Sequence, residues 1–193
     1  MGKIIPLTQE MNQIYNSIKL NDGYEIVSHL FLEGLACYGI KSYKAVAIMC
    51  RASIESLVFL CIYYSIIESY EENKKNVILQ SNGFDLPNFV FKNKNGFDKQ
   101  LDVLIKLGFI DNEFKKEIIT LREFGNFAAH LAQRSNKQIS EKTQEFSKIY
   151  PNGIPVELYE DTIDISQPKA KEIIEKTAKV INYISEKESK ILK

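Results

Sequence analysis

The chain has 193 residues, of which 45% are hydrophobic and 26% are charged, and its 25 Lys and Arg residues balance its 25 Asp and Glu residues. This composition is typical of a folded globular domain and excludes wholesale disorder. Because the formal net charge is zero, no global field attracts nucleic acid, so a nucleic-acid partner needs a local basic patch. The length suits one domain whose core needs no metal or disulfide.

The first segment, residues 1–22, is predicted to be a helical extension of the main domain, residues 23–193. Apolar residues have helical spacing from Ile4 to Lys19, and the turn-forming sequence LNDGY ends that pattern. The first residues lack the apolar run of a signal peptide. The longest apolar run, Ser56 to Ile67, is shorter than the roughly 20 residues that a membrane span needs. We therefore expect a cytoplasmic protein with no membrane partner.

Two helices are predicted next, over Tyr24 to Tyr38 and from Tyr43 to about Ser69. Gly39 is expected to end the first helix and Ser42 to cap the second. The second helix is apolar nearly all round, which is typical of a helix at the centre of a bundle or of an oligomer. The three cysteines form no C-x-x-C pair and are expected to be buried free thiols in a reducing cytoplasm: Cys37, Cys50 and Cys61.

Helical spacing resumes later in the chain over three further segments, which are Asp98 to Gly108, Glu113 to Gln133 and Lys169 to about Lys187. Gly108 is expected to end the first of these helices. Asp111 or Asn112 is expected to cap the second, and Ser166 is expected to cap the third.

Two long connections separate these helices. Residues 71–98 are polar, with one short helix predicted near residues 74–80, and residues 150–168 are predicted to be an extended loop or a short hairpin. The sequence therefore predicts an all-α bundle of about five main helices with long connecting loops.

A polar stripe is predicted on the helix that holds the segment LREFGNFAAH. Residues four apart on a helix lie on one side of it, so Arg122, Asn126 and His130 form a stripe roughly 12 Å long. The residues beside this stripe are small, namely Gly125, Ala129 and Ala132. They would let another helix approach closely, which would offset the roughly 1 kcal/mol that a glycine costs inside a helix.

A second polar pair, Arg51 and Glu55, has the same four-residue spacing on the apolar helix. Burying two charges costs several kcal/mol per ion unless each finds a partner. The simplest arrangement places the two helices face to face, with Glu55 near Arg122, Asn126 or His130. Alternatively, Arg51 and Glu55 form only an intrahelical pair on a partly solvated edge. Asn126 and His130 could likewise be structural core residues.

Other charged residues give weaker signals. The lysine clusters are interleaved with polar and acidic residues, which favours solvated faces over nucleic-acid patches: Lys92, Lys94 and Lys99, and Lys169, Lys171, Lys176 and Lys179. No group of Asp, Glu, His or Cys has a metal-ligand spacing, so neither a metal nor another cofactor is expected.

Two motifs in this order resemble a known family. REFGNFAAH is similar to the R-x-x-G-N-x-x-A-H signature of a branch of HEPN-like proteins whose function is largely unassigned. AVAIMCRASIESLVF resembles the A-x-x-x-R-x-x-x-E helix of the same branch through Ala47, Arg51 and Glu55. The lead-in LDVLIKLGFID and the final helix AKEIIEKTAKVINYI also match, so the resemblance covers roughly Tyr24 to Ser185.

The resemblance implies an up-and-down helical bundle, often paired as a dimer. Many HEPN domains are metal-independent ribonucleases of toxin–antitoxin, phage-defence and RNA-guided systems. In them the Arg of an R-x(4–6)-H motif contacts the scissile phosphate, His assists attack by the ribose 2′-OH, and two domains combine their residues. This chain departs from that pattern, because Gly125 stands in the arginine's place and seven residues separate Arg122 from His130.

Two functional hypotheses follow. In the first, the chain is an RNA-binding or RNA-cleaving effector in bacterial defence or stress. His130 would act as general base or acid, while Arg122 and Arg51 stabilise phosphate charge and Asn126 and Glu55 orient them. In the second, the same residues form a buried network that fixes helix register, in a non-catalytic module for dimerisation or for binding a nucleotide or protein. The expected partners are a second copy, RNA or a nucleotide, and a protein encoded nearby.

Overall fold

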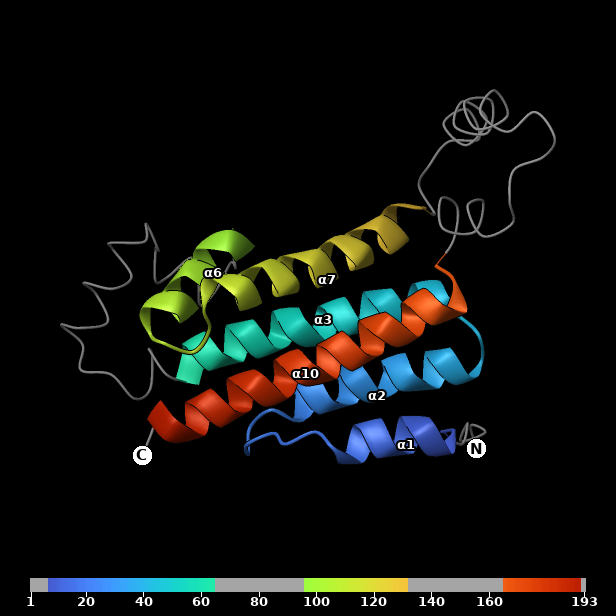
Figure 1. Ribbon diagram of the computed structural model, residues 1–193, viewed down its shortest axis with the longest axis horizontal. Coiled ribbons are helices and arrows are strands. Elements are labelled where there is room, and N and C mark those ends of the chain that lie inside the picture. The colour runs from blue at the N-terminus through green and yellow to red at the C-terminus, as the bar shows by residue number, and fades with distance from the viewer. Residues whose placement is uncertain (1–6, 65–95, 132–164, 192–193) are drawn as a thin grey trace, which may run out of the picture.

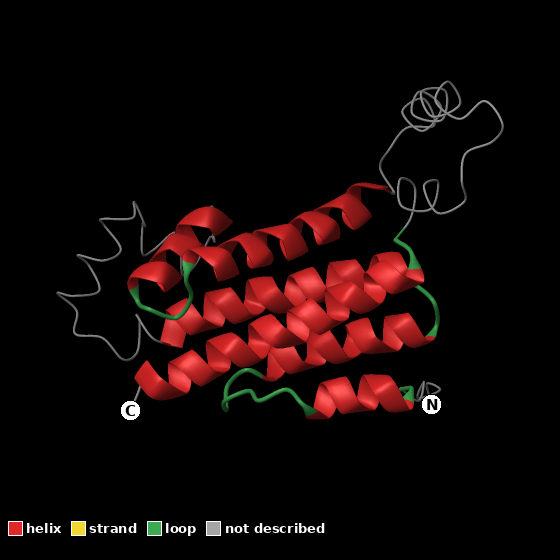
Figure 2. Ribbon diagram, viewed as in Figure 1, coloured by secondary structure: helices red, strands yellow, loops and turns green. Residues whose placement is uncertain are grey.

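The computed structural model describes residues 7–64, 96–131 and 165–191 of the chain. Its helices are α1 (Gln9–Asn16), α2 (Glu25–Gly39), α3 (Tyr43–Ile62), α6 (Phe97–Lys106), α7 (Asn112–Leu131) and α10 (Gln167–Ile191) (Figure 1). Within these residues all regular structure is helical (Figure 2), which confirms the predicted all-α bundle. The helix predicted near residues 74–80 and most of both long connections lie outside the described residues.

The long apolar helix α3 is the centre of the bundle. It packs against α2, α7, α10 and α6, and Figure 1 shows α1, α2, α3, α7 and α10 running alternately in opposite directions. Its buried residues recur at helical intervals and cover about half of its circumference: Val46, Ala47, Cys50, Ser53, Ile54, Leu57, Val58, Cys61 and Ile62. The central position predicted from the apolar circumference of this helix is therefore confirmed, within a single chain.

By length and composition α3 could also cross a membrane. In the described part of the chain it is the one helix with this property, and 50% of its 18-residue apolar stretch is buried inside the bundle. This burial matches a core helix, because α3 packs against four other helices.

The chain between α6 and α7 turns as the sequence predicts. Gly108 has φ 79°, and the backbone N–H of Phe109 donates to the Leu104 carbonyl at 2.9 Å, which is the hydrogen bond of a left-handed helix end. The Asp111 carboxylate then accepts from the Phe114 N–H at 2.8 Å, so Asp111 is the residue that caps α7.

The turn between α2 and α3 differs from the prediction. Gly39 is still helical, and the left-handed residue is Lys41, with φ 61°. The Ser42 N–H donates to the Cys37 carbonyl at 2.9 Å, but the Ser42 side chain makes no capping hydrogen bond. Packing of α2 on α3 decides where the chain turns, and a non-glycine residue accepts the left-handed conformation there at a cost of about 1 kcal/mol.

The ends of three other helices also differ from the predicted ones. α1 is shorter than predicted because Thr8 caps it, accepting from the Met11 N–H at 3.3 Å. α6 begins one residue early, at Phe97. α10, Gln167–Ile191, extends beyond the predicted Lys169 to Lys187 at both ends. Ser166 directly precedes its first residue, and Pro168 lies in its first turn, where a missing N–H costs no hydrogen bond.

The segment that precedes α2 is joined to α10 by polar side chains. Asn182 accepts from the Lys19 N–H at 2.8 Å and donates to the Ser17 carbonyl at 3.1 Å. Glu188, which is only 3% exposed, accepts from Asn21 at 2.7 Å and from the Tyr24 hydroxyl. Burial raises the pKa of Tyr24, which keeps the phenol protonated as a donor to Glu188. Residues near the start of the chain therefore complete the polar contacts of its last described helix.

Candidate functional site

The candidate site lies where α7 crosses α3, and a glycine sets the distance between the two helices. Gly125 is buried, and a Cβ atom built there would lie 2.4 Å from the Cβ and 2.6 Å from the Cδ of Arg51. The same atom would lie 3.0 Å from the carbonyl oxygen of Ala47. The backbone of α7 therefore rests directly on α3, which confirms the predicted reason for a glycine in this helix.

An ion-pair cluster joins the two helices beside this contact. One oxygen of Glu55, Oε1, accepts from the Nε of Arg51 at 3.0 Å and from the Nε of Arg122 at 2.8 Å. The guanidinium of Arg122 also lies 4.8 Å above the ring centre of Phe97, the first residue of α6. The cluster predicted across two helices is confirmed for Arg51, Glu55 and Arg122.

The exposure of the cluster corrects the prediction that it is buried. The side chains of Arg51, Glu55 and Arg122 are 26%, 31% and 35% exposed. The cluster therefore lies on a partly solvated edge, as the alternative prediction had it. Glu55 nevertheless pairs with an arginine on each of the two helices. Asn126 follows one turn along α7, and within the described residues no hydrogen bond joins its side chain to the cluster, so that part of the prediction is wrong.

Replacing Glu55 with alanine is expected to lower the free energy of unfolding by about 1 to 2 kcal/mol, because two neighbouring cations lose their shared partner. Full burial would have implied about 3 kcal/mol or more, but water screens a cluster that is one-third exposed. Urea unfolding measures the change, with Glu123→Ala, an exposed glutamate of α7, as the matched control. Equal midpoints for the two variants would show that the cluster contributes no stability.

The predicted stripe on α7 continues through the histidine. α7 remains helical to Leu131, so helix geometry places the Cα of His130 about 12 Å along the axis from that of Arg122 and on the same side as Asn126. The side chain of His130 lies outside the described residues. The structure thus brings Arg51, Glu55 and Arg122 together, with the backbone of His130 two turns farther along α7 than Arg122.

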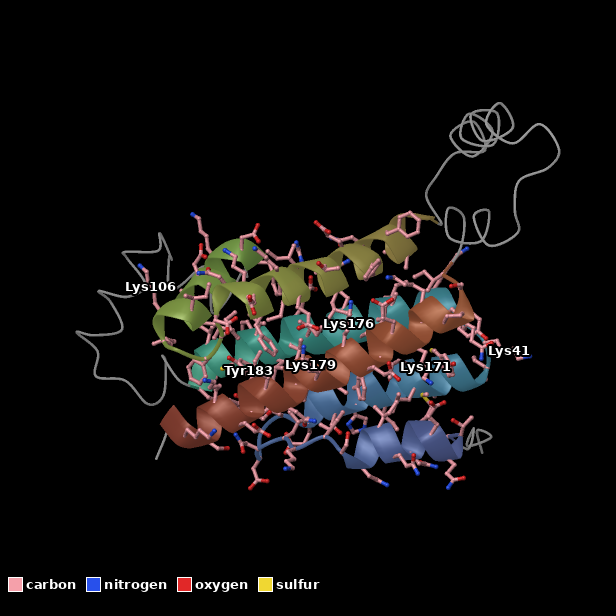
Figure 3. The ribbon with its side chains drawn as sticks, in the orientation of Figure 1. Lys41, Lys106, Lys171, Lys176, Lys179 and Tyr183 are labelled. Atoms are coloured by element: carbon pink, nitrogen blue, oxygen red, sulfur yellow. The ribbon has the colours of Figure 1, made fainter. Side chains whose placement is uncertain are left out.

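The lysines of α10 form a different kind of surface. Figure 3 shows Lys171, Lys176, Lys179 and Tyr183 following one another along this helix. Each of its lysines in this region has a carboxylate partner: Lys169 and Lys176 pair with Glu172 at 2.9 and 2.6 Å, Lys171 with Glu10 at 2.6 Å, and Lys179 with Glu117 at 3.1 Å. This pairing favours the predicted solvated face over a nucleic-acid patch, because the positive charge is already neutralised.

Sequence reasoning missed the role of Phe97. The helical pattern begins only at Asp98, so the sequence places Phe97 in a connection rather than in the site. An aromatic ring at the start of a helix gives no sign of what it will contact, since its cation–π contact with Arg122 depends on how α6 packs against α7. Phe97 limits the positions that the Arg122 side chain can take.

No family model, curated protein or solved structure matches this chain. Two guanidinium groups and one carboxylate give the cluster a net charge of about +1 at neutral pH. Such a cluster, partly open to water and held by packing, is suited to binding an anion.

Proposed function

We propose that this chain is a HEPN-like effector that binds RNA and cleaves it without a metal, acting in the cytoplasm in bacterial defence or stress. The observation that carries the proposal is the Arg51–Glu55–Arg122 cluster on the α3–α7 face. The cluster supplies positive charge, and α7, the helix that carries Arg122, continues to His130. Phosphodiester cleavage by a neighbouring hydroxyl needs a base and a cation that stabilises phosphate charge.

In the proposed reaction His130 takes the proton of a ribose 2′-OH as general base. The O2′ atom then attacks the adjacent phosphorus, and the bond from phosphorus to the 5′-oxygen breaks. The leaving oxygen takes up a proton from solvent and protonated His130 returns its proton to solvent, so the products are a 2′,3′-cyclic phosphate and a 5′-hydroxyl. Arg122 and Arg51 stabilise the extra negative charge on the phosphate, and Glu55 orients both arginines.

Cleavage in the absence of divalent metal tests this function. Purified protein is incubated with several RNAs in EDTA, and the ends of the products are identified by mass spectrometry. We expect fragments with cyclic phosphate ends. Absence of cleavage across all the RNAs would contradict the catalytic proposal.

The network itself supports a second candidate, a non-catalytic module for dimerisation or for binding a nucleotide or a protein encoded nearby. Because Glu55 bonds to arginines on two helices, it ties α3 to α7 in one register. A protein that binds RNA or a nucleotide in EDTA but leaves every RNA intact would support this module.

We further propose that the protein is a homodimer. Each chain contributes one histidine in the motif, and the resemblance implies that two domains combine their residues into one site. The buried half of α3 gives no support, because it packs against other helices of the same chain. Light scattering at micromolar concentration should give twice the 22.2 kDa of one chain. A mass near that of a single chain would exclude the dimer.

A further inference from the structure

Each arginine of the cluster contacts Glu55 through its own Nε atom. Among the described residues, the Glu55 carboxylate accepts from the Nε of Arg51 and from the Nε of Arg122. A guanidinium has five N–H donors, so the two terminal amino groups on each arginine are left over from this contact. These terminal groups form the forked pair of hydrogen bonds with which arginine recognises phosphate oxygens.

The packing holds the two guanidiniums close together. Because both Nε atoms bond to one oxygen, at 3.0 and 2.8 Å, they lie within about 6 Å of each other. The stem of Arg51 is fixed against the backbone of α7, since its Cβ and Cδ fill the space beside Gly125. The guanidinium of Arg122 lies over the ring of Phe97. Two cations held this close retain a net positive charge that a bound anion would neutralise.

We infer that Arg51 and Arg122 form a clamp for one phosphate group, with Glu55 orienting both guanidiniums and Gly125 admitting the α3 arginine to the polar side of α7. The clamp rests on the proposed function in one respect: the bound phosphate is taken to belong to an RNA backbone rather than to a free nucleotide. A larger side chain at position 125 would occupy the space that Arg51 now fills. Gly125 on α7 therefore leaves the space that the side chain of Arg51 on α3 occupies.

The arginine side chains can be observed directly in solution. The chain has only three arginines, Arg51, Arg122 and Arg134, so the Nε–Hε region of a nitrogen–proton NMR spectrum of the whole protein holds three signals to assign. Arg51→Lys and Arg122→Lys assign the two signals of the clamp. The labelled protein is titrated separately with inorganic phosphate, adenosine 5′-monophosphate and a 2′-O-methyl RNA oligonucleotide that cannot be cleaved.

We expect phosphate to shift the Arg51 and Arg122 signals together, with one dissociation constant. Each Lys variant should weaken phosphate binding by about tenfold, because lysine keeps the charge but loses the forked donors. Lys116→Gln, which removes an exposed charge from α7, should bind as the wild type does. Circular dichroism checks that each variant is folded.

Other results overturn the inference. Signals unmoved by about 10 mM phosphate would exclude a clamp, and movement of one arginine alone would exclude a shared site. Wild-type affinity in both Lys variants would show that charge alone attracts the anion. Tighter binding of the oligonucleotide than of the mononucleotide identifies RNA as the source, and the reverse identifies a nucleotide. RNA cleavage with unmoved signals would refute the clamp but not the ribonuclease, whereas shifted signals without cleavage would refute only the ribonuclease.

Discussion

Replacing Gly125 with alanine is expected to destabilise the bundle by about 2 kcal/mol, although alanine is the better helix former by about 1 kcal/mol. The new Cβ would lie 2.4 Å from the Cβ of Arg51 and 3.0 Å from the Ala47 carbonyl oxygen. Neither atom is the end of a flexible side chain, so rotation of a side chain cannot relieve the contact. α3 and α7 must move apart, which weakens the packing along both helices.

Gly34 provides a matched control for this substitution. It is also a buried glycine of a helix that packs on α3, but a Cβ there would lie 3.4 Å from the Cβ of Met49 and 3.5 Å from the Sγ of Cys50. Gly34→Ala should therefore be neutral or stabilising by up to about 1 kcal/mol. Thermal unfolding compares the two variants. A Gly125→Ala protein as stable as Gly34→Ala would refute the close helix contact.

Replacing His130 with alanine is expected to lower the rate of RNA cleavage by about 10²- to 10⁴-fold, which is the usual contribution of a general base or acid. Histidine is the side chain of the motif whose unperturbed pKa lies near neutrality, so it can exchange a proton with the 2′-OH at physiological pH. The fold should persist, because α7 tolerates alanine as a helix former.

The controls for His130→Ala separate chemistry from contamination. Arg122→Ala should be nearly as damaging, since Arg122 supplies charge to the phosphate, whereas Lys116→Gln should cleave as the wild type does. All four proteins are purified in the same way and assayed side by side in EDTA. Equal cleavage by wild type and His130→Ala would show that a contaminating nuclease, or another site, is responsible.

The features predicted correctly from the sequence depend on local chemistry or on strong patterns. The apolar circumference of α3 indicates a central helix whatever its neighbours are. Gly108 and Asp111 mark helix ends because few residues can take a left-handed conformation or accept the N–H groups of a first turn. The pairing of Glu55 with Arg122 follows from two helices that each carry a charge needing a partner.

The features that could not be predicted depend on how the helices pack. The exposure of the cluster is set by the depth at which α3 and α7 meet and by the position of Phe97, and neither leaves a pattern in the sequence. Asn126 shares a helical stripe with Arg122, but spacing along one helix does not fix which side chains reach a neighbouring helix. Lys41 takes the left-handed conformation because the packing of α2 on α3 places the turn there.

The position of α10 has a consequence for the order in which the protein folds. α10 contacts α1, α2, α3 and α7, and it closes the core with side chains that are almost fully buried: Ile173, Ile174, Val180, Ile181 and Ile184. Its contact with Tyr24 joins residues 164 positions apart. The ribosome releases α1 to α7 before α10 exists, so the apolar faces that α10 covers stay exposed during most of translation. We therefore expect the nascent chain to be prone to aggregation until α10 has been synthesised, and we expect the long-range contacts of α10 to make the closing step slow.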